Sequence, residues 1–490
     1  MQRPLPWKEL LGDRAPSVRS AAAMLTSLTA LAATSLIAAP SVAVPLSEAC
    51  TLRRTQAHHS EGLDTWNSAY PRPTRDLDAV LVFLSFPDAA PLTTPTELTA
   101  DHFPATSEFF ERASYGKFSL HPHPRREWLE MPRSSTAYAI RRDWNSEHRA
   151  AYLRDALATA DPHVDFSRYD IVYFVADPHA PGVDSDATKV VNLESPVEVD
   201  GTGLRRVVTV FERHPPDRLV LAHETGHVFD LPDLYHRPAD GKGDWDTHVG
   251  DWDLMGSQFA LAPDLFAWHK WKLGWLEPRQ VTCVRGTGST RLTLEAVGAG
   301  PADGYEEEGG EFGDAGEGAG AGGDVRVGAV SGAGAGAGAG AASGARGGVG
   351  GGGGVDSGGG VAGVAAGARA LGSGRGAKLA VVRTGPDSAL GIEARGAVGN
   401  DASLCTQGVL VYRIRGGTES GGGPIEVLDA HPRTEACWED SVYPPLADAP
   451  VGVGESFAVP GEAVRVAVEG RTASGAWTVR ITTGDGRPTA

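Results

Sequence analysis

Two histidines flank a glutamate at a spacing that could hold a catalytic metal ion. His223, Glu224 and His227 form the pattern H-E-x-x-H. On a helix, residues four apart share a face, so both imidazoles can present a ring nitrogen to one ion. Glu224 would point towards a metal-bound water, whose pKa zinc lowers to about 7. The pattern therefore predicts hydrolytic chemistry at neutral pH, with Glu224 as the base.

The surroundings of this pattern strengthen a signal that is weak by itself. With 15 histidines in 490 residues, chance alone produces H-E-x-x-H in roughly a few such chains per hundred. Pro215-Pro216-Asp217 is a helix-start signal just upstream. The apolar Leu221 and Val228 lie on a different helical face from the histidines. We therefore expect a helix at residues 217–229 that carries the metal site.

A catalytic zinc site needs a third protein ligand and leaves one position for water. Asp233 lies six residues beyond His227, just after Pro232, and a turn of the chain there would return its carboxylate to the ion. Asp230 is the main competitor because it lies on the helix face of His223. The other candidates are His236, Asp251 and Asp253. The spacing of extended zinc-helix motifs favours Asp233.

Strand and helix patterns alternate over the segment that contains these residues. Short apolar runs predict buried strands at 79–86, 171–175 and 207–211. Helical patterns occupy residues 107–112, 146–160, 217–229 and 263–273. An α/β or α+β domain from about residue 75 to 280 follows from this alternation.

The pattern changes after Cys283. Alternating or β-branched runs separated by glycine-rich turns predict a smaller all-β domain. These runs lie at 291–294, 379–383, 409–414, 464–468 and 477–481. Residues 298–376 interrupt them with a Gly/Ala-rich stretch that has an acidic front half. It cannot bury enough apolar surface to offset its ordering entropy, so we expect a disordered insertion.

The N-terminus has the features of an export signal. Basic residues precede a charge-free, Ala- and Leu-rich stretch at 20–39, and Ser41-Val42-Ala43 is a small-x-small cleavage signature. A signal peptide at residues 1–43 is favoured over a permanent membrane anchor. We therefore expect a secreted, extracellular protein that has no stable membrane insertion after cleavage.

Charge and cysteine content narrow the choice of partners. The formal net charge of −18 argues against a nucleic-acid partner. All four cysteines follow the cleavage signature, and export makes disulfides plausible. Of the three possible pairings we favour Cys50 with Cys283 and Cys405 with Cys437. Zinc ligation by cysteine is not expected, because no two cysteines form a C-x-x-C pair.

Several further stretches continue the metal-binding pattern. Residues 231–235 read LPDLY, 250–256 read GDWDLMG, 109–117 read FFERASYGK, 266–275 read FAWHKWKLGW and 408–414 read GVLVYRI. In these stretches the chain resembles the immune inhibitor A-like family of secreted metallopeptidases, which are related to the metzincins. That family has the pattern H-E-x-x-H-x-x-G-x-P-D-x-Y, followed by W-D-x-M. The resemblance covers residues 77–280 well and is weaker in the β region.

The resemblance implies an α+β fold. A zincin-like catalytic domain with an active-site helix and a mixed sheet would occupy residues 76–280, after an N-terminal linker at 44–75. A smaller, sandwich-like β domain would follow at 281–297 and 377–490, interrupted by the disordered insertion at 298–376.

The resemblance also implies roles for single residues. One zinc ion would be held by His223, His227 and Asp233. Met255 would lie in a tight turn and pack beneath the metal site without binding the ion. An ordinary core methionine is an equally good description. Tyr235 would hydrogen-bond the tetrahedral oxyanion, with a structural phenol as the alternative. Residues 207–211 would be the edge strand that pairs with an extended substrate, or else an internal strand.

The chain departs from the family pattern at one position. The glycine that follows the second histidine in the family is Asp230 in this chain. A glycine there would let the helix end with a positive φ. Aspartate tolerates that conformation better than most residues, so we expect the turn to survive.

Asp240, Asp244 and Asp246, together with Gly241 and Gly243, suggest a calcium loop. Their spacing is not that of an EF-hand, so Ca²⁺ is a secondary expectation.

These observations predict a secreted zinc metalloendopeptidase that acts on protein or peptide substrates. Two alternatives stay open at this point. The chain could be a catalytically silent binding or adhesion protein that keeps the fold, although the intact Glu224 argues against this. It could also be a zinc hydrolase that cleaves a non-peptide bond.

Overall fold

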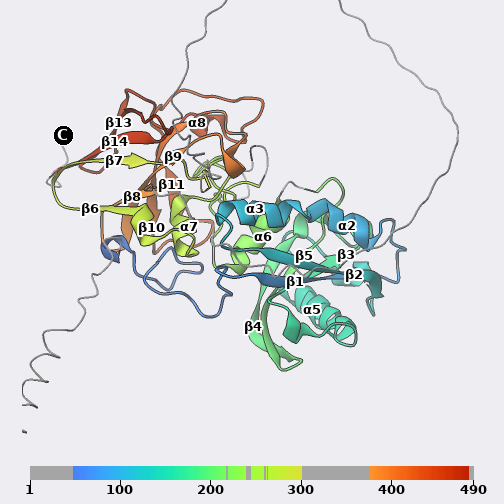
Figure 1. Cartoon of the computed structure of the whole chain (residues 1–490). Coiled ribbons are helices and arrows are strands. Elements are labelled where there is room, and N and C mark those ends of the chain that lie inside the picture. The colour runs from blue at the N-terminus through green and yellow to red at the C-terminus, as the bar shows by residue number, and fades with distance from the viewer. Residues whose placement is uncertain are drawn as a thin grey trace, which may run out of the picture. The chain divides into compact units, whose positions relative to one another are not determined.

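The computed structural model describes residues 48–216, 219–238, 244–258, 261, 263–300 and 376–484. These residues belong to one compact unit (Figure 1). The expected signal peptide at 1–43 lies outside the described residues, as does almost all of the expected insertion at 298–376. In the described ranges, no helix is both long enough and apolar enough to cross a membrane.

A five-stranded mixed sheet forms the first half of the unit. Its strand order is β2(Leu120–Glu130), β1(Leu77–Ser85), β3(Ile171–Ala176), β5(Thr202–Val210) and β4(Lys189–Val199). The first three pairings are parallel, and β5 pairs with β4 antiparallel. The strands expected at 79–86, 171–175 and 207–211 are confirmed.

Strand β1 lies between β2 and β3 and is buried on both faces, which explains its nearly continuous apolar sequence. Alternate side chains point to opposite faces. Leu81 and Phe83 contribute to one hydrophobic cluster, and Val80 and Val82 contribute to another.

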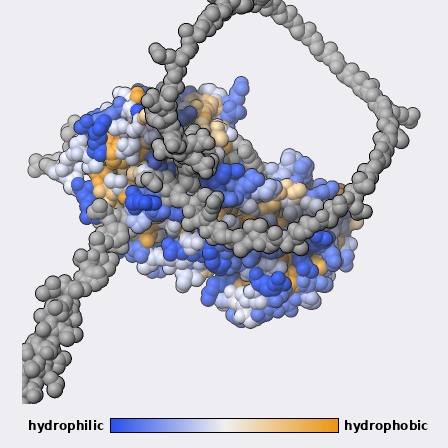
Figure 2. Space-filling view, viewed as in Figure 1, coloured by the Kyte–Doolittle hydropathy of each residue, from blue (hydrophilic) through white to orange (hydrophobic). Residues whose placement is uncertain are grey.

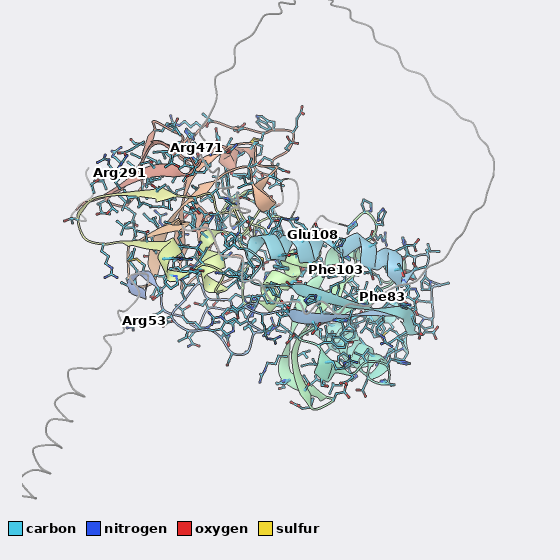
Figure 3. All side chains as sticks on the ribbon, viewed as in Figure 1. Arg53, Phe83, Phe103, Glu108, Arg291 and Arg471 are labelled. Carbon is cyan, nitrogen blue, oxygen red and sulfur yellow. A yellow bond between two sulfur atoms is a disulfide. The ribbon has the colours of Figure 1, made fainter. Side chains whose placement is uncertain are left out.

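Helices cover the two faces of this sheet. Helices α2(Pro95–His102), α3(Ala105–Ala113) and α6(Val220–Val228) lie on the face of Phe83, while α5(Ser146–Ala160) covers the opposite face (Figure 1). Phe103, just after α2, belongs to the same cluster as Phe83 (Figure 3). The helix expected at 146–160 has the expected bounds, and the helix expected at 107–112 is longer by a few residues.

Helix α7(Ala267–Lys272) is shorter than the helix expected at 263–273. Acidic side chains accept hydrogen bonds from the backbone N–H groups just before α7. Asp264 Oδ1 accepts from Leu265 N, and Asp253 Oδ2 accepts from Phe266 N. Such side-chain acceptors compete with helical hydrogen bonding. The pattern at 263–266 therefore belongs to an extended lead-in rather than to the helix.

The second half of the unit contains two further sheets. One has the order β11(Ile425–Val427), β10(Gly408–Arg415), β9(Ser388–Arg395), β8(Leu379–Arg383) and β6(Val281–Val284). The other has the order β12(Ser456–Ala458), β13(Val464–Arg471), β14(Trp477–Thr483) and β7(Gly288–Leu294). One face from each sheet contributes to a shared hydrophobic cluster, so the two sheets form a sandwich.

Short helical segments complete the described elements. They are α4(Ser135–Tyr138), α8(Pro444–Ala447), η1(Glu48–Cys50), η2(Phe166–Arg168), η3(Ser185–Ala187), η4(Pro278–Gln280) and η5(Gly399–Asp401).

The two halves share one core. Tyr412 and Ile414 of β10 belong to the same hydrophobic cluster as Leu221 of α6. The rings of Phe266 and Tyr412 lie 4.5 Å apart. The second half therefore packs directly against the elements that carry the histidines.

Two disulfides join distant parts of the chain. Cys50 pairs with Cys283 and Cys405 pairs with Cys437, which confirms both favoured pairings. The first ties the N-terminal segment to β6.

The expectation that residues 207–211 form an edge strand is wrong, and the internal-strand alternative holds. Strand β5 lies between β3 and β4, and β4 is the edge. A tight turn at Asp200 and Gly201, both with positive φ, folds β4 back onto β5. Because β4 contains charged residues and Pro196, its composition gave little signal for a strand.

Most of the visible surface is hydrophilic, and apolar residues appear there only in small, scattered patches (Figure 2). Large exposed apolar side chains in the described ranges are few: Leu92, Val197, Val398, Trp438 and Val453. Apolar surface is thus mainly gathered in the cores.

A buried histidine links three segments of the unit. His269 of α7 is fully buried, with Nδ1 3.1 Å from Asp253 Oδ2 and Nε2 3.0 Å from Glu61 Oε1. Burial lowers the pKa of His269, but the Glu61 and Asp253 carboxylates outweigh this effect and raise it to about 9.

This arrangement predicts a pH-dependent contribution to stability. His269 has a higher pKa in the folded than in the unfolded state, so its contribution is complete below about pH 6.5 and lost as pH rises through about 9. The stability advantage of wild type over His269→Gln should shrink by about 3 kcal/mol across that window. Urea unfolding at several pH values measures this. A constant difference would contradict the buried charged network.

Candidate metal centre

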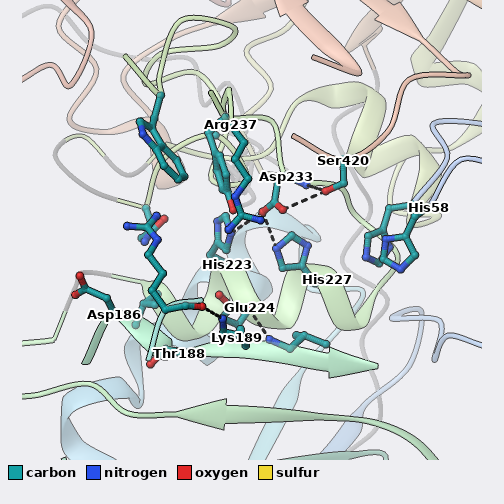
Figure 4. A pocket seen from close by; sticks show the side chains of 18 of the residues that line it. His58, Asp186, Thr188, Lys189, His223, Glu224, His227, Asp233, Arg237 and Ser420 are labelled. Carbon is teal, nitrogen blue, oxygen red and sulfur yellow. Dashed lines mark hydrogen bonds and ion pairs between the residues drawn. The ribbon is translucent and has the colours of Figure 1, made fainter. Parts of the chain in front are cut away.

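Helix α6 and the segment after it bring three potential ligands together. Nε2 of His223 lies 3.5 Å from Asp233 Oδ1, and Nε2 of His227 lies 3.0 Å from the same oxygen (Figure 4). One ligand atom from each residue lies within 4.8 Å of the other two. No second such group of His, Cys, Asp or Glu side chains occurs among the described residues.

Backbone carbonyls orient both imidazole rings. Nδ1 of His223 lies 2.9 Å from the carbonyl oxygen of Leu254, and Nδ1 of His227 lies 2.8 Å from that of Leu231. A carbonyl can only accept, so each Nδ1 must carry a proton, and each ring in its neutral form would then have the lone pair of its Nε2 available for a metal ion. Protein metal sites use the same outer hydrogen bonds to fix the tautomer of ligating histidines.

The chain reverses directly after α6. Asp230 has a φ of +65°, and Leu231 N donates to Gly226 O at 3.1 Å, the hydrogen bond of a Schellman cap. The expectation that Asp230 would take up a positive φ is confirmed. This reversal brings both the Leu231 carbonyl and the Asp233 carboxylate back to His227.

Asp230 itself faces away from the histidine pair. Its Oδ2 lies 2.7 Å from Arg54 Nη1 and its Oδ1 lies 3.0 Å from His59 Nδ1. Burial raises the pKa of Asp230, but the hydrogen bond to His59 and the charges of Lys272 and Arg54 outweigh it and lower the pKa to about 2. Asp230 is therefore an ion-pair partner of the N-terminal segment.

The remaining ligand candidates have other partners. Asp253 accepts from Met255 N, Phe266 N and His269. Asp251 Oδ2 accepts from Val442 N and from the Ser441 hydroxyl. The His236 ring packs edge-on against His248 at 5.2 Å. Of the five candidates, only Asp233 joins the two histidines. Asp240, part of the suggested calcium loop, lies outside the described residues.

A turn at residues 253–257 packs against α6. Asp253 O accepts from Gly256 N and Ser257 N, which places the Leu254 carbonyl against His223. Met255 is fully buried, and its Sδ lies 2.4 Å from where a Cβ on Gly226 would be. A side chain at position 226 would have to displace the end of the Met255 side chain, so Met255 packs directly against the helix at this glycine.

Glu224 lies beside the edge strand. Its Oε2 accepts a 2.8 Å hydrogen bond from Val190 N of β4. Burial raises the pKa of Glu224, an effect that His227 and His223 only partly offset. A carboxylate with a raised pKa suits proton transfer near neutral pH.

The electrostatics of the cluster formed by His223, His227 and Asp233 favour a positive charge. Burial lowers the pKa of His227, but the Asp233 carboxylate more than offsets this and raises it to about 9. The pKa of Asp233 is well below its usual value because the charges of both histidines outweigh its burial. The Asp233 carboxylate therefore stays ionised and favours a positive charge beside it, which is either a proton on His227 or a cation that replaces that proton.

A cleft of about 590 Å³ opens over these residues. Tyr235 lines it, with its ring stacked 6.3 Å from that of His223 and tilted against that of Trp245 at 5.4 Å. Tyr235 is thus in the cleft, as either of its two expected roles allows.

Sequence reasoning missed several other residues of the cleft. His58 and His59 come from the segment expected to be a linker, and Ser420 comes from the β region. Arg142, Lys189, Arg237 and Trp245 also line the cleft. These residues lie far from the zinc-helix pattern or have no fixed spacing to it. The sequence contains no periodic signal that could have identified them.

No protein-family model matches the chain, and no curated protein matches its sequence. The likeness to immune inhibitor A-like peptidases therefore rests on the motifs themselves.

The Asp230–Arg54 pair should couple the helix turn to the N-terminal segment. Asp230→Asn keeps the turn but removes the charge, and a broken buried pair should reduce the free energy of unfolding by about 3 kcal/mol. In a double-mutant cycle with Arg54→Ala, we expect a coupling energy of at least about 1 kcal/mol. Arg53→Ala changes the neighbouring exposed arginine (Figure 3) and serves as the control. Additive losses would show that the pair contributes nothing.

Proposed function

We propose that the protein is a secreted zinc-dependent endopeptidase. The observation that carries this proposal is the convergence of His223 Nε2, His227 Nε2 and Asp233 Oδ1 in a cleft beside Glu224. The resemblance to secreted metallopeptidases over residues 77–280 points in the same direction. Two disulfides and the expected export signal favour an extracellular location.

The donor set fits zinc. Two neutral imidazoles and one carboxylate are common ligands of catalytic zinc, and three protein ligands leave a position open. Their outer hydrogen bonds are already made by the Leu254 and Leu231 carbonyls. Zinc would supply the acidity that lets a water lose a proton near neutral pH.

Glu224 would move that proton. Val190 N–H holds Oε2 in place, so the other carboxylate oxygen can accept a proton from the attacking water. Glu224 would then deliver the proton to the nitrogen of the departing amine, which completes peptide hydrolysis. Because its pKa is raised, Glu224 can both accept and release a proton more readily at neutral pH than an ordinary glutamate.

The substrate would be an extended protein or peptide segment. Lys189, Val190 and Asn192 of the edge strand β4 line the cleft. Glu224 occupies the N–H of Val190, but an edge strand offers further backbone groups that can hydrogen-bond to an incoming chain. This geometry favours peptides over small esters as substrates.

Glu224→Gln should separate catalysis from metal binding. Losing the base should reduce the rate of casein hydrolysis by about 10²–10⁴-fold, while zinc content stays near one ion per chain. Glu198→Gln, an exposed change on the same strand β4, is the control and should keep full activity. If Glu224→Gln cleaves casein at the wild-type rate, the proposed mechanism is wrong. If wild type binds zinc without hydrolysing casein or peptides, the chain is a binding protein.

The two aspartates after the helix should differ in their effect on metal affinity. Asp233→Asn removes the charge of a direct ligand and should weaken zinc binding by at least about 100-fold. Asp230→Asn should leave zinc affinity nearly unchanged, because its carboxylate contacts Arg54 and His59. Competition with a chromophoric chelator measures both values. The reverse order would make Asp230 the ligand.

A further inference from the structure

A loop from the second half of the unit reaches the candidate metal centre. It connects β10 to β11 and spans residues 416–424. Gly421 N donates to the carbonyl oxygen of Asp233 at 2.9 Å, and Arg237 N donates to that of Gly421 at 3.3 Å. The segment after α6 is therefore hydrogen-bonded to a loop that lies almost 190 residues further along the chain.

Ser420 contacts Asp233 twice through its hydroxyl group. Its Oγ accepts from Asp233 N at 2.8 Å and donates to Asp233 Oδ2 at 3.1 Å (Figure 4). A serine hydroxyl has one proton to donate, and that proton goes to the carboxylate. Oδ2 is thus engaged, while Oδ1 faces His223 and His227 at 3.5 and 3.0 Å.

Ser420 holds one of the two carboxylate oxygens of Asp233, whose side chain also interacts with those of His223, His227 and Tyr235. Asp233 lies outside any helix or strand, and its side chain is 22% exposed, against 4% for His223. A partly exposed carboxylate can rotate about its side-chain bonds. A metal ligand with that freedom loses affinity, because binding must then order it.

The loop itself is held in place from the other side. The hydroxyls of Thr55 and Ser60 both donate to the carbonyl oxygen of Gly416, at 2.6 and 3.2 Å. His58 N donates to Glu419 Oε2 at 2.9 Å. The N-terminal segment thus holds the loop at two points just before Ser420, so Ser420 is presented from a fixed support.

We infer that Ser420 is a positioning residue for the metal site, which holds Asp233 so that one oxygen, Oδ1, binds the ion. The β region would then complete the metal centre instead of serving as an accessory domain. This inference rests on the proposed zinc function and extends it to a residue outside the zinc-helix motif.

Zinc affinity of the full chain tests this inference. Ser420→Ala should weaken zinc binding by about 10–100-fold, the usual effect of losing an outer-shell partner. Ser420→Thr keeps the hydroxyl and should stay close to wild type. Thr418→Ala is the control in the same loop, because the hydrogen bond of Thr418 to Arg415 comes from its backbone. Chelator competition gives the dissociation constants, and thermal unfolding of the metal-free variants reports any general loss of stability.

A double variant separates positioning from a loss of fold. If Ser420 acts through the carboxylate, Ser420→Ala should weaken zinc binding much less in an Asp233→Asn background than in wild type. If the effects of Ser420→Ala and Asp233→Asn on zinc affinity are fully additive, the inference is wrong, even if the single Ser420→Ala variant binds zinc poorly. Wild-type affinity in Ser420→Ala would overturn it too and leave the proposed function intact. If the wild-type protein binds no zinc, both the inference about Ser420 and the proposed function are wrong.

Discussion

The left-handed turn at Asp230 is the constraint on which the site depends. With a φ of +65°, Asp230 ends α6 and reverses the chain. The reversal places the Leu231 carbonyl on Nδ1 of His227 and the Asp233 carboxylate against both Nε2 atoms. Glycine would adopt this turn with less strain, but aspartate adds a carboxylate that pairs with Arg54 and His59. One residue therefore both shapes the metal site and holds the N-terminal segment beside it.

The supporting interactions around the site come from four separate parts of the chain. The N-terminal segment contacts Asp230, the edge strand β4 holds Glu224, the turn at 253–257 orients His223, and the β10–β11 loop holds Asp233. Three of these contacts fix the side chains of Glu224, His223 and Asp233, and the contact to Asp230 fixes the turn that carries Asp233. Preorganisation of this kind reduces the conformational entropy lost when a ligand binds. The fold is thus arranged around four side chains that lie within a span of eleven residues.

Sequence analysis predicted the local features and both disulfide pairings, but it missed the strand order and the other long-range contacts of the site. Periodicity identified α5 and the buried strands because burial dictates those patterns directly. The joining of Asp233 to the histidines was anticipated from a spacing of six residues. The edge strand was assigned wrongly because strand order depends on pairing between distant segments, and β4 has little apolar alternation. Ser420 and His59 contact the site from 187 and 171 residues away from their partners, Asp233 and Asp230, and no local pattern encodes such contacts.

The shared core has a consequence for the timing of folding. Apolar side chains of α6 and α7 are covered partly by Tyr412 and Ile414 of β10, which the ribosome makes long after the histidines. Until those strands emerge, this surface stays open to water and the cluster lacks its last supporting loop. If the chain cleaves peptides as proposed, its synthesis order would delay proteolytic competence until nearly the whole polypeptide exists.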